Sequence, residues 1–377
     1  MENKTTTKLP GYAQFTLILF SLCLLLTIIY LGKQILVPIM LALLFSILLN
    51  PTVNFLNGKW KIPNVVAVLF SIIILFAFLA GIMLFIYWQI SDISHEWPMI
   101  KRNFNIHIRN IEGWIQQTFH VSRFKQEQYI EEKAMESMNE GNLMGNTLSS
   151  FSNTFASLIL IPLYTFLILL YRKLFINFLL QIVNPKNEAK LIDILVNIGS
   201  IVQNYIVGLI IEMIIVASLT AGGLMLLDVR YAILLGVITA ILNLIPYIGI
   251  LCAAIITIVA ALINTTDPSI VVKIILMVWA IQLFDNNFLV PKIVGNKVKI
   301  NALVSIIGVI VGGTIAGVAG MFLALPTIAI LKVIFDRIDS LKPYGYLMGD
   351  DLPKSIKWKS ILLPDLNPEI KKNESKP

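Results

Sequence analysis

The segment 231–263 contains no Asp, Glu, Lys or Arg, and it is longer than a single membrane crossing requires. A transmembrane helix needs about 20 apolar residues to cross a hydrocarbon core of ~30 Å. Because an α-helix rises ~1.5 Å per residue, this segment would reach about 50 Å as a straight helix. Its middle contains Pro246, which lacks a backbone N–H, and Gly249, which permits a reversed backbone. We therefore expect two half-length helices joined by a flexible centre.

A second long apolar block, 301–331, also has a centre that can break, because it is rich in glycine. The glycines of this block are Gly308, Gly312, Gly313, Gly317 and Gly320. Several of them have the GxxxG spacing, which is more often a close helix contact than a ligand site. We expect Gly312, Gly313, Gly317 and Gly320 to serve as hinge or packing positions.

The rest of the chain is typical of an all-α membrane protein. Hydrophobic residues make up 57% of the 377 positions and charged residues only 14%, against roughly 25% charged in soluble domains. The mean hydropathy of +0.82 argues against a soluble enzyme, a nucleic-acid-binding protein and a disordered scaffold. Six full spans are predicted near 15–31, 35–56, 63–90, 148–171, 198–227 and 269–290.

The net charge of +7 is interpreted as the excess of Lys and Arg that cytoplasmic loops carry. Basic residues place both termini in the cytoplasm and leave 91–147, with eight acidic and six basic residues, outside. The basic residues used are Lys4, Lys8, Lys59, Lys61, Arg172 and Lys173. The expected regions are three spans in 1–90, an amphipathic helical insertion in 91–147, a fourth span and surface helix in 148–197, a core in 198–338 and a tail in 339–377.

Flanking charges also favour two re-entrant hairpins over two kinked crossings. Basic residues lie on both sides of 301–331, so that this block enters and leaves on the cytoplasmic face. By parity, 231–263 then begins and ends outside. The span 198–227 with one hairpin and the span 269–290 with the other form an inverted repeat, a recurring plan of secondary transporters. The alternative is eight spans, two of them kinked.

Ionisable residues inside spans are costly and mark candidate functional positions. Glu212 lies near the middle of 198–227, where a carboxyl group is costly to ionise and suits proton binding and release. The alternative is a neutral Glu212 hydrogen-bonded between helices. Gln282, Asp285 and Asn286 have i, i+3 and i+4 spacing, which puts them on one helical face able to bind a cation or polyol. Their alternative role is a helix end at the lipid headgroups.

The centre of 231–263 provides a third set of candidates. Asn243 and Tyr247, beside the hinge residues Pro246 and Gly249, form the expected tip of the first hairpin. Unpaired carbonyls there, with an amide and a phenol, can coordinate a polar ligand. The alternative is that the tip packs against the other hairpin.

Catalytic, cofactor and metal motifs are missing from the sequence. His95-Glu96 is not followed by the second histidine of HExxH, and no GxxxxGK[ST] phosphate loop occurs. Cys23 and Cys252 lie in apolar runs and indicate neither a disulfide nor a metal site. We therefore expect no enzyme activity, no cofactor and no metal.

The second half of the chain resembles the autoinducer-2 exporter (AI-2E) family of bacterial membrane proteins, most clearly over 198–337. The residues that carry the resemblance are Asn243-Leu-Ile-Pro246-Tyr247-Ile-Gly249, Gln282, Asp285-Asn286-Asn287, Pro291-Lys292-Ile-Val-Gly295, the glycines of the second block, Leu325-Pro326 and Lys332. Family members usually have Glu where Asp285 stands. The resemblance implies a permease of the bacterial cell membrane that forms homo-oligomers, with Pro291 as a further hinge position. Some members are linked to autoinducer-2 export, and others are similar to sodium(lithium)/proton antiporters.

The leading hypothesis is a secondary transporter that moves a small polar solute or cation by alternating access. The two hairpins are expected to form the central site, with Gln282, Asp285 and Asn286 binding the solute or ion and Glu212 carrying a proton. The expected partners are the lipid bilayer, the solute or cation and further copies of the chain, with no nucleic acid. A non-transporting scaffold or sensor that binds a partner through 91–147 is the alternative from another class, and a channel is a third.

Overall fold

The protein is described here by a computed structural model. It describes residues 10–95, 102, 103, 106, 109, 113, 117, 159–245, 248–264, 267, 269–294 and 300–350. All regular secondary structure in these ranges is helical, which confirms the prediction of an all-α polytopic membrane protein. By length and apolarity alone, six helices could cross a membrane, or seven if the bent pair Ile159–Leu170 and Arg172–Ile182 counts as one span. One of the six is Ala302–Arg337, whose backbone breaks at Ala316 and Gly317.

The helices of the first half are α1 (Gly11–Leu31), α2 (Lys33–Lys59), α3 (Asn64–His95), the helix Ile159–Leu170 and α7 (Arg172–Ile182). The helices of the second half are η1 (Pro185–Asn187), α8 (Glu188–Leu226), α9 (Ala232–Asn243), α10 (Ile248–Asn264), α11 (Ser269–Phe284), the π-helix η2 (Asp285–Val294), α12 (Ala302–Arg337) and α13 (Lys342–Met348). The expected insertion 91–147 falls almost wholly outside the described residues, as does the tail beyond 350.

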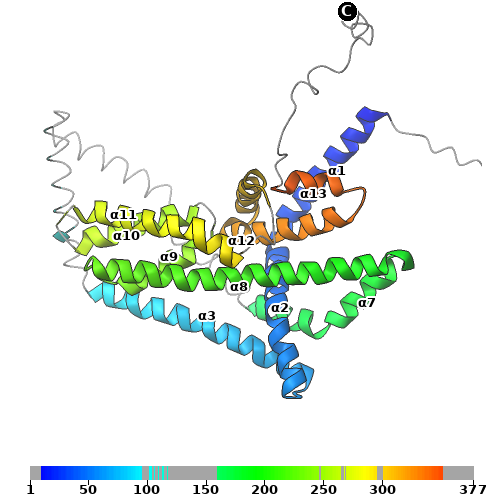
Figure 1. The fold of residues 1–377 in the computed structure, drawn as a ribbon, viewed down its shortest axis with the longest axis horizontal. Helices are drawn as coiled ribbons and strands as arrows, with labels where there is room; N and C mark the ends of the chain where they lie inside the picture. Colours follow the sequence, from blue (N-terminus) through cyan, green and yellow to red (C-terminus); the bar gives the residue numbers. More distant parts are fainter. Residues whose placement is uncertain are drawn as a thin grey trace, which may run out of the picture.

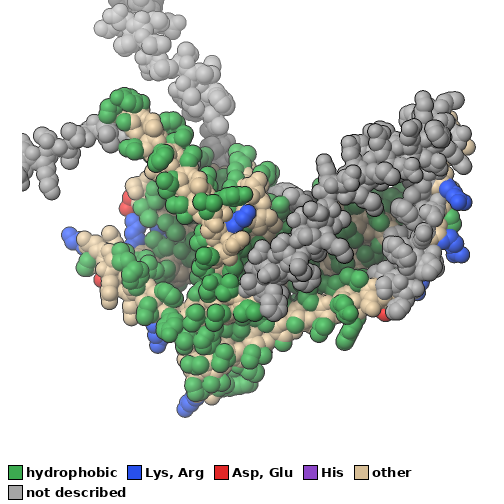
Figure 2. Space-filling model, turned by 180° about the vertical axis from the view of Figure 1, so that it is seen from behind, with side chains coloured by type: hydrophobic (Ala, Val, Ile, Leu, Met, Phe, Trp, Pro, Cys, Tyr) green, Lys and Arg blue, Asp and Glu red, His purple; other side chains and the backbone are tan. Residues whose placement is uncertain are grey.

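The described surface is apolar enough to require lipid. Large hydrophobic side chains are exposed along α1, α3 and α11, for example Phe15, Phe78 and Trp279. Hydrophobic side chains cover most of the described face in Figure 2, and the Lys and Arg side chains visible there lie mainly near its edges. Soluble proteins rarely expose apolar patches of more than a few hundred Å². The helix surfaces are therefore lipid-facing.

The long helix α8 organises the core (Figure 1). At 39 residues it is about 59 Å long, so that it extends well beyond a ~30 Å hydrocarbon core. Helix α9, π-helix η2 and α11 contact α8, and α2 and α12 contact it as well. Glu212, Val216, Thr220 and Leu224 are all buried, and their spacing of four residues puts them on one face of α8.

The first apolar block folds back on itself as a hairpin of α9 and α10. Ala232 at the start of α9 and Ala261 near the end of α10 belong to the same buried cluster, although they are far apart in sequence. Gly249 lies so close to the preceding turn that a Cβ there would overlap the carbonyl oxygen of Leu242. Pro246, expected to break the helix, lies outside the described residues.

The second block also reverses, within α12. Ala316 and Gly317 are not helical, and Gly317 has φ 60° and ψ −142°, a backbone conformation essentially restricted to glycine. A Cβ at Gly308 would overlap the side chain of Ile328, which would be about 30 Å away in a straight helix. Both long blocks are therefore hairpins, and neither is a single straight crossing.

The two ends of the second hairpin lie at the same end of the molecule. Asn301 accepts a hydrogen bond from the Val304 amide at 2.9 Å and so caps the first arm of α12. The Asn301 side chain also donates to the carbonyl oxygens of Leu347 at 2.7 Å and Gly349 at 3.2 Å, beyond the second arm. The block thus begins and ends beside the same segment, as a re-entrant hairpin requires. The membrane face from which it enters stays a prediction.

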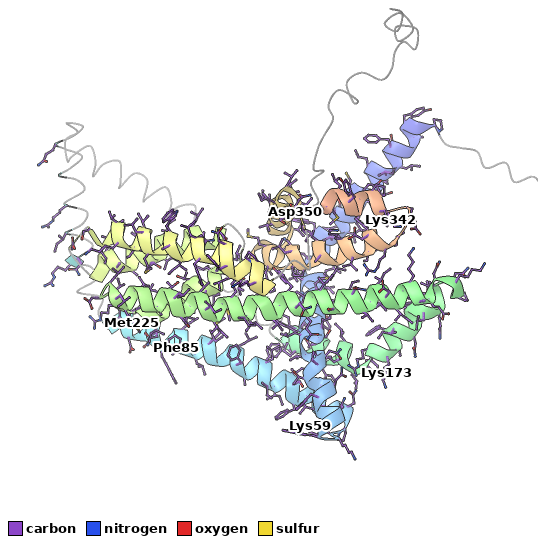
Figure 3. All side chains as sticks on the ribbon, in the orientation of Figure 1. Lys59, Phe85, Lys173, Met225, Lys342 and Asp350 are labelled. Atoms are coloured by element: carbon purple, nitrogen blue, oxygen red, sulfur yellow. The ribbon has the colours of Figure 1, made fainter. Side chains whose placement is uncertain are left out.

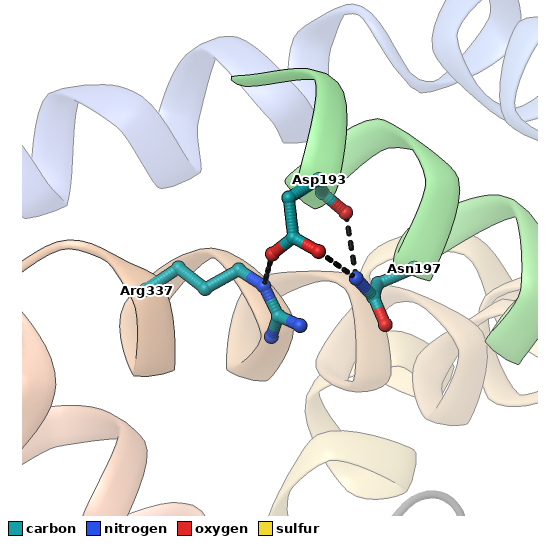
Figure 4. Close-up of polar contacts among 3 residues, drawn as sticks. All are labelled: Asp193, Asn197 and Arg337. Atoms are coloured by element: carbon teal, nitrogen blue, oxygen red, sulfur yellow. Dashed lines mark hydrogen bonds and ion pairs between the residues drawn. The ribbon is translucent and has the colours of Figure 1, made fainter. Parts of the chain in front are cut away.

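Ion pairs join the start of α8 to the end of the second hairpin. Arg337 at the end of α12 contacts the Asp193 carboxylate, which also accepts from the Asn197 amide at 2.8 Å (Figure 4). Asp339 contacts Lys190 at 3.0 Å and Lys342 at 2.7 Å. Hydrogen bonds from the two lysines, with their positive charge, lower the pKa of Asp339 to about 2.

The labelled residues of Figure 3 show which elements lie at each end of α8. In Figure 3, Met225 lies at one end of α8, whereas Lys173 on α7 and Lys342 on α13 lie toward the other end.

The surface helix expected within 172–197 is shorter than predicted. It comprises α7, which has no buried residue, and α8 begins at Glu188, ten residues before the predicted span.

Candidate functional site

Three polar side chains from separate elements meet inside the second half of the protein. Glu212 comes from the middle of α8, Asn243 is the last residue of α9, and Asp285 is the first residue of η2. The Asn243 amide nitrogen donates to the Glu212 carboxylate at 3.1 Å, and its side chain also forms a hydrogen bond with Asp285. Glu212 is 7% and Asp285 3% exposed. One amide thus links two buried carboxyl groups.

A small cavity of about 20 Å³ lies beside these residues. It is bounded by α8, α9, α10, α11 and the start of η2, and its lining residues are Val216, Thr220, Thr239, Asn243, Ile250, Val278, Ile281, Gln282 and Asp285. About 10–15 Å³ of such volume is needed to hold one water molecule. The cavity is therefore large enough for one water molecule or one small ion.

Asp285 is incompletely satisfied by the protein. Its Oδ1 atom is buried and receives no hydrogen bond from the described residues. Leaving a buried polar group unpaired costs about 1–3 kcal/mol, and more when it is charged. No ion pair among the described residues involves Glu212 or Asp285. The pair therefore requires a proton, a cation or a polar guest to be stable at this depth.

The π-helix determines how the predicted polar face is divided. A π-helix has i→i+5 hydrogen bonds, and such turns are frequent at functional sites. Asp285, at the point where α11 changes to η2, is buried, whereas the next residue, Asn286, is exposed. Gln282 lines the cavity and donates to Asn286 at 3.1 Å. The structure brings Gln282 and Asp285 to the cavity and leaves Asn286 on its outer side.

The other predicted positions are distributed over both hairpins. Tyr247 and Pro246 lie outside the described residues, and Gly249 is buried at the tip of the first hairpin. Pro291 lies inside η2 and is exposed.

Gly312 and Gly320 face each other between the arms of the second hairpin, because a Cβ on either residue would overlap the carbonyl oxygen of the other. A Cβ on Gly313 would meet the Met321 side chain, and Gly317 forms the reversal. No residue of this hairpin lines the cavity. The structure therefore differs from the expectation that both hairpins form the site: the first hairpin contributes Asn243, and α8, α11 and η2 supply the rest.

Two buried threonines are part of the site and were not expected from the sequence. Thr220 is 1% and Thr239 7% exposed, and both line the cavity. Thr220 follows Glu212 by eight residues, so that the periodicity of α8 puts both on one face. That spacing is the signal by which the sequence could have identified Thr220. Thr239 stands on α9 four residues before Asn243, so that both lie on one face of α9. This spacing is the signal by which the sequence could have identified Thr239.

Comparison with known proteins finds similarity to candidate transport proteins of several bacteria. YrrI of Bacillus subtilis, named as a candidate transport protein, is 30% identical over 131 residues, which are 35% of this chain and 36% of YrrI. YueF of the same organism, also named as a candidate transport protein, is 26% identical over 204 residues, 52% of this chain and 55% of YueF. PerM of Escherichia coli, named as a candidate permease, is 26% identical over 177 residues, 47% of this chain and 50% of PerM. The alignments thus span about a third to half of the relatives' length.

The family comparison covers far more of the chain than these pairwise alignments. Residues 19–340 match the AI-2E family transporter profile, and this range includes both hairpins and the whole polar cluster. The resemblance inferred from Asn243, Gln282 and Asp285 is thereby confirmed. The chain is a member of the AI-2E family of transporters.

Proposed function

We propose that the protein is a secondary transporter whose binding site is formed by Glu212, Asn243 and Asp285. The observation that carries this proposal is the pair of buried carboxyl groups joined by one amide beside a small cavity. Membership of the AI-2E family and the similarity to transport proteins and a permease support it. An ionisable residue within a membrane span is a functional candidate by default.

The chemistry of the site suits coupling to a cation. Two carboxyl groups held near each other in a medium of low dielectric cannot both ionise without a compensating charge. Exchange of a proton for a metal cation satisfies that requirement in both states of a transport cycle. Glu212 and Asp285 then carry the exchanged charge, and Asn243 adjusts its amide to either carboxyl group.

The moving part in this proposal is the first hairpin. Asn243 lies at the tip of the first hairpin, whereas Glu212 belongs to the long helix α8. The two elements pack closely through small residues: a Cβ on Gly236 of α9 would overlap the backbone of Ala217 on α8. Small residues at an interface allow such close packing of two helices. We infer that movement of the hairpin along α8 opens the cavity to either face in turn.

The size of the cavity favours an ion over a larger solute in this conformation. A volume of about 20 Å³ is suited to one ion or water molecule, and not to a furanone-derived signal such as autoinducer-2. Sodium(lithium)/proton antiport is therefore the activity to test first. Export of an autoinducer-2-like solute is the second candidate, and it requires the first hairpin to move away from α8.

The localisation proposed is the bacterial cytoplasmic membrane, with both termini in the cytoplasm and several copies of the chain in each assembly. The second hairpin then enters from the cytoplasm. A variant with Cys23→Ser and Cys252→Ser, carrying Asn296→Cys, tests this with a membrane-impermeant thiol reagent on intact cells. No labelling until the cells are opened supports the proposal. Labelling of intact cells contradicts it.

Transport by the purified full-length protein in liposomes tests the function. An imposed pH gradient is combined separately with sodium, lithium and autoinducer-2, and protein-free liposomes are the control. We expect cation-dependent dissipation of the gradient or pH-dependent movement of autoinducer-2. Absence of both activities, with loss of function on deletion of 91–147, would instead support the scaffold or sensor.

A further inference from the structure

A second and much larger cavity lies away from the polar cluster. Its volume is about 1040 Å³, and it is formed by α2, the helix Ile159–Leu170, α7 and the first part of α8, with Ile330 from α12. This exceeds the upper end of the roughly 300–1,000 Å³ typical of small-molecule sites. Most of its lining is apolar, including Phe175 and Leu179 from α7. None of its lining residues belongs to the proposed transport site.

Arg172 is the one charged residue among those that line this cavity. It stands where the chain bends by 63° between the helix Ile159–Leu170 and α7. Its guanidinium group donates to the amide oxygen of Asn50 and, at 2.9 Å, to that of Asn54. Both partners are neutral, and no described Asp or Glu forms an ion pair with Arg172. The half-buried cation is therefore not neutralised by the described protein.

Polar groups on α8 face the same space. Ser200, Gln203 and Asn204 line the cavity and share one helical face by their i, i+3 and i+4 spacing. The Asn204 amide donates to the Ser200 hydroxyl at 3.2 Å. Gln203 is half-buried and forms no hydrogen bond with the described residues, so its amide is available to a guest. The cavity thus combines a cation, the free amide of Gln203 and a long apolar wall.

Helix α7 continues the apolar wall to the outside. It has no buried residue, and Leu174, Phe178 and Ile182 are exposed. An amphipathic helix of this kind lies in the membrane interface with its apolar side toward the acyl chains. The cavity therefore opens where a lipid headgroup and the first part of its acyl chain would be found.

We propose that this cavity binds an anionic phospholipid. The phosphate is held by the Arg172 guanidinium and the neighbouring amides, and an acyl chain lies along Phe175 and Leu179. Guanidinium groups bind phosphate through two parallel hydrogen bonds, and basic pockets between transmembrane helices bind anionic headgroups. Because the described lining contains no Asp or Glu, it offers nothing to pair with the ammonium of a zwitterionic lipid. A lipid held there would connect α7 to α2 and α8.

Native mass spectrometry of the purified full-length protein tests this inference. Phosphatidylglycerol and phosphatidylcholine are added separately at equal concentration, with inorganic phosphate as a third arm. We expect the protein to retain phosphatidylglycerol selectively, and Arg172→Gln to reduce that retention about tenfold, the effect of losing one hydrogen-bonded charge. The matched control is Lys173→Gln, which removes the neighbouring charge outside the cavity lining and should leave retention unchanged.

Gly199→Leu provides a variant that keeps Arg172 and its amide partners intact. Gly199 lines the cavity, and a Cβ there would meet nothing within 4 Å, so that a leucine fills part of the space without overlap at its base. We expect it to lower phosphatidylglycerol retention as Arg172→Gln does. Equal retention of the two lipids by the unaltered protein would overturn the proposal. So would binding of phosphate alone as strong as that of the lipid, or equal losses in Lys173→Gln and Arg172→Gln.

Discussion

Asn243 donates a hydrogen bond of 3.1 Å to Glu212, and the two residues are 31 positions apart in the chain. The contact joins the tip of a re-entrant hairpin to the middle of α8, the longest of the described helices. Asp285 approaches the same amide from a third element. In the proposed function, this polar connection inside an apolar bundle couples the position of the hairpin to the charge of the two carboxyl groups.

Replacing Asn243 should uncouple the hairpin from α8. In Asn243→Leu, both carboxyl groups lose their shared amide, and we expect a loss of stability of about 1–3 kcal/mol together with at least tenfold slower transport. Thermal unfolding in detergent and flux in liposomes measure the two effects. Asn287→Ala is the control, because Asn287 is exposed and, within the described part of the chain, its side chain bonds only to the Leu283 carbonyl. Equal effects of the two substitutions would show that Asn243 has no special role.

The second hairpin should tolerate no side chain between its arms. Gly312→Ala and Gly320→Ala each place a methyl group against the backbone of the facing arm, and we expect each to cost about 1–3 kcal/mol of stability. Gly222→Ala is the matched control, since a Cβ at Gly222 in α8 meets nothing within 4 Å and alanine is the better helix former. If thermal unfolding shows Gly222→Ala to be less stable than Gly312→Ala and Gly320→Ala, the close approach of the two arms is contradicted.

The base of the second hairpin should depend on Asn301. Asn301→Ala removes the cap of α12 and the two bonds to Leu347 and Gly349, and we expect a loss of about 0.5–2 kcal/mol from the cap alone. Asn301→Asp keeps the cap acceptor but cannot donate, so it separates the two effects. Hydrogen exchange should then increase around α13 in both variants and at the start of α12 only in Asn301→Ala. Unchanged hydrogen exchange of α13 in both variants would contradict a stabilising role of the Asn301 bonds to Leu347 and Gly349.

The ion pairs at Asp339 should not contribute to pH dependence near neutrality. The pKa of Asp339 is lowered from 3.8 to about 2, so its stabilising effect is complete above about pH 4 and is lost as the pH falls toward 2. We expect the thermal stability difference between the unaltered protein and Asp339→Asn to be constant from pH 5 to 8. The difference should shrink below pH 4. A difference that varies between pH 6 and 8 would contradict this assignment.

Part of this structure could be predicted from local sequence. The two reversals can be predicted because they depend on local properties of the backbone. These properties are the length and the glycine of 231–263, and the glycines of 301–331. Buried carboxyl groups at Glu212 and Asp285 follow from their place in apolar segments. These features need no knowledge of distant contacts.

Other features depend on contacts that no local pattern records. The spacing of Gln282, Asp285 and Asn286 assumes an α-helix, whereas the π-helix that starts at Asp285 turns Asn286 outward. The pairing of Asn243 with Glu212 depends on how α9 packs against α8. The first turns of α8, from Glu188, extend beyond the apolar core and are therefore amphipathic and polar. A search for apolar spans does not detect such turns. The cavity at Arg172 is formed by segments from both halves of the chain.

Proton movement through liposomes that contain the purified protein tests the central claim most directly. An internal pH-sensitive dye is followed after sodium is added to the unaltered protein, Glu212→Gln, Asp285→Asn and the control Asn287→Ala. If the buried pair carries the exchanged charge, the unaltered protein and Asn287→Ala move protons, and both carboxyl variants are at least tenfold slower. Equal proton flux in all four proteins, with equal amounts inserted, would contradict the claim that Glu212 and Asp285 form the transport site.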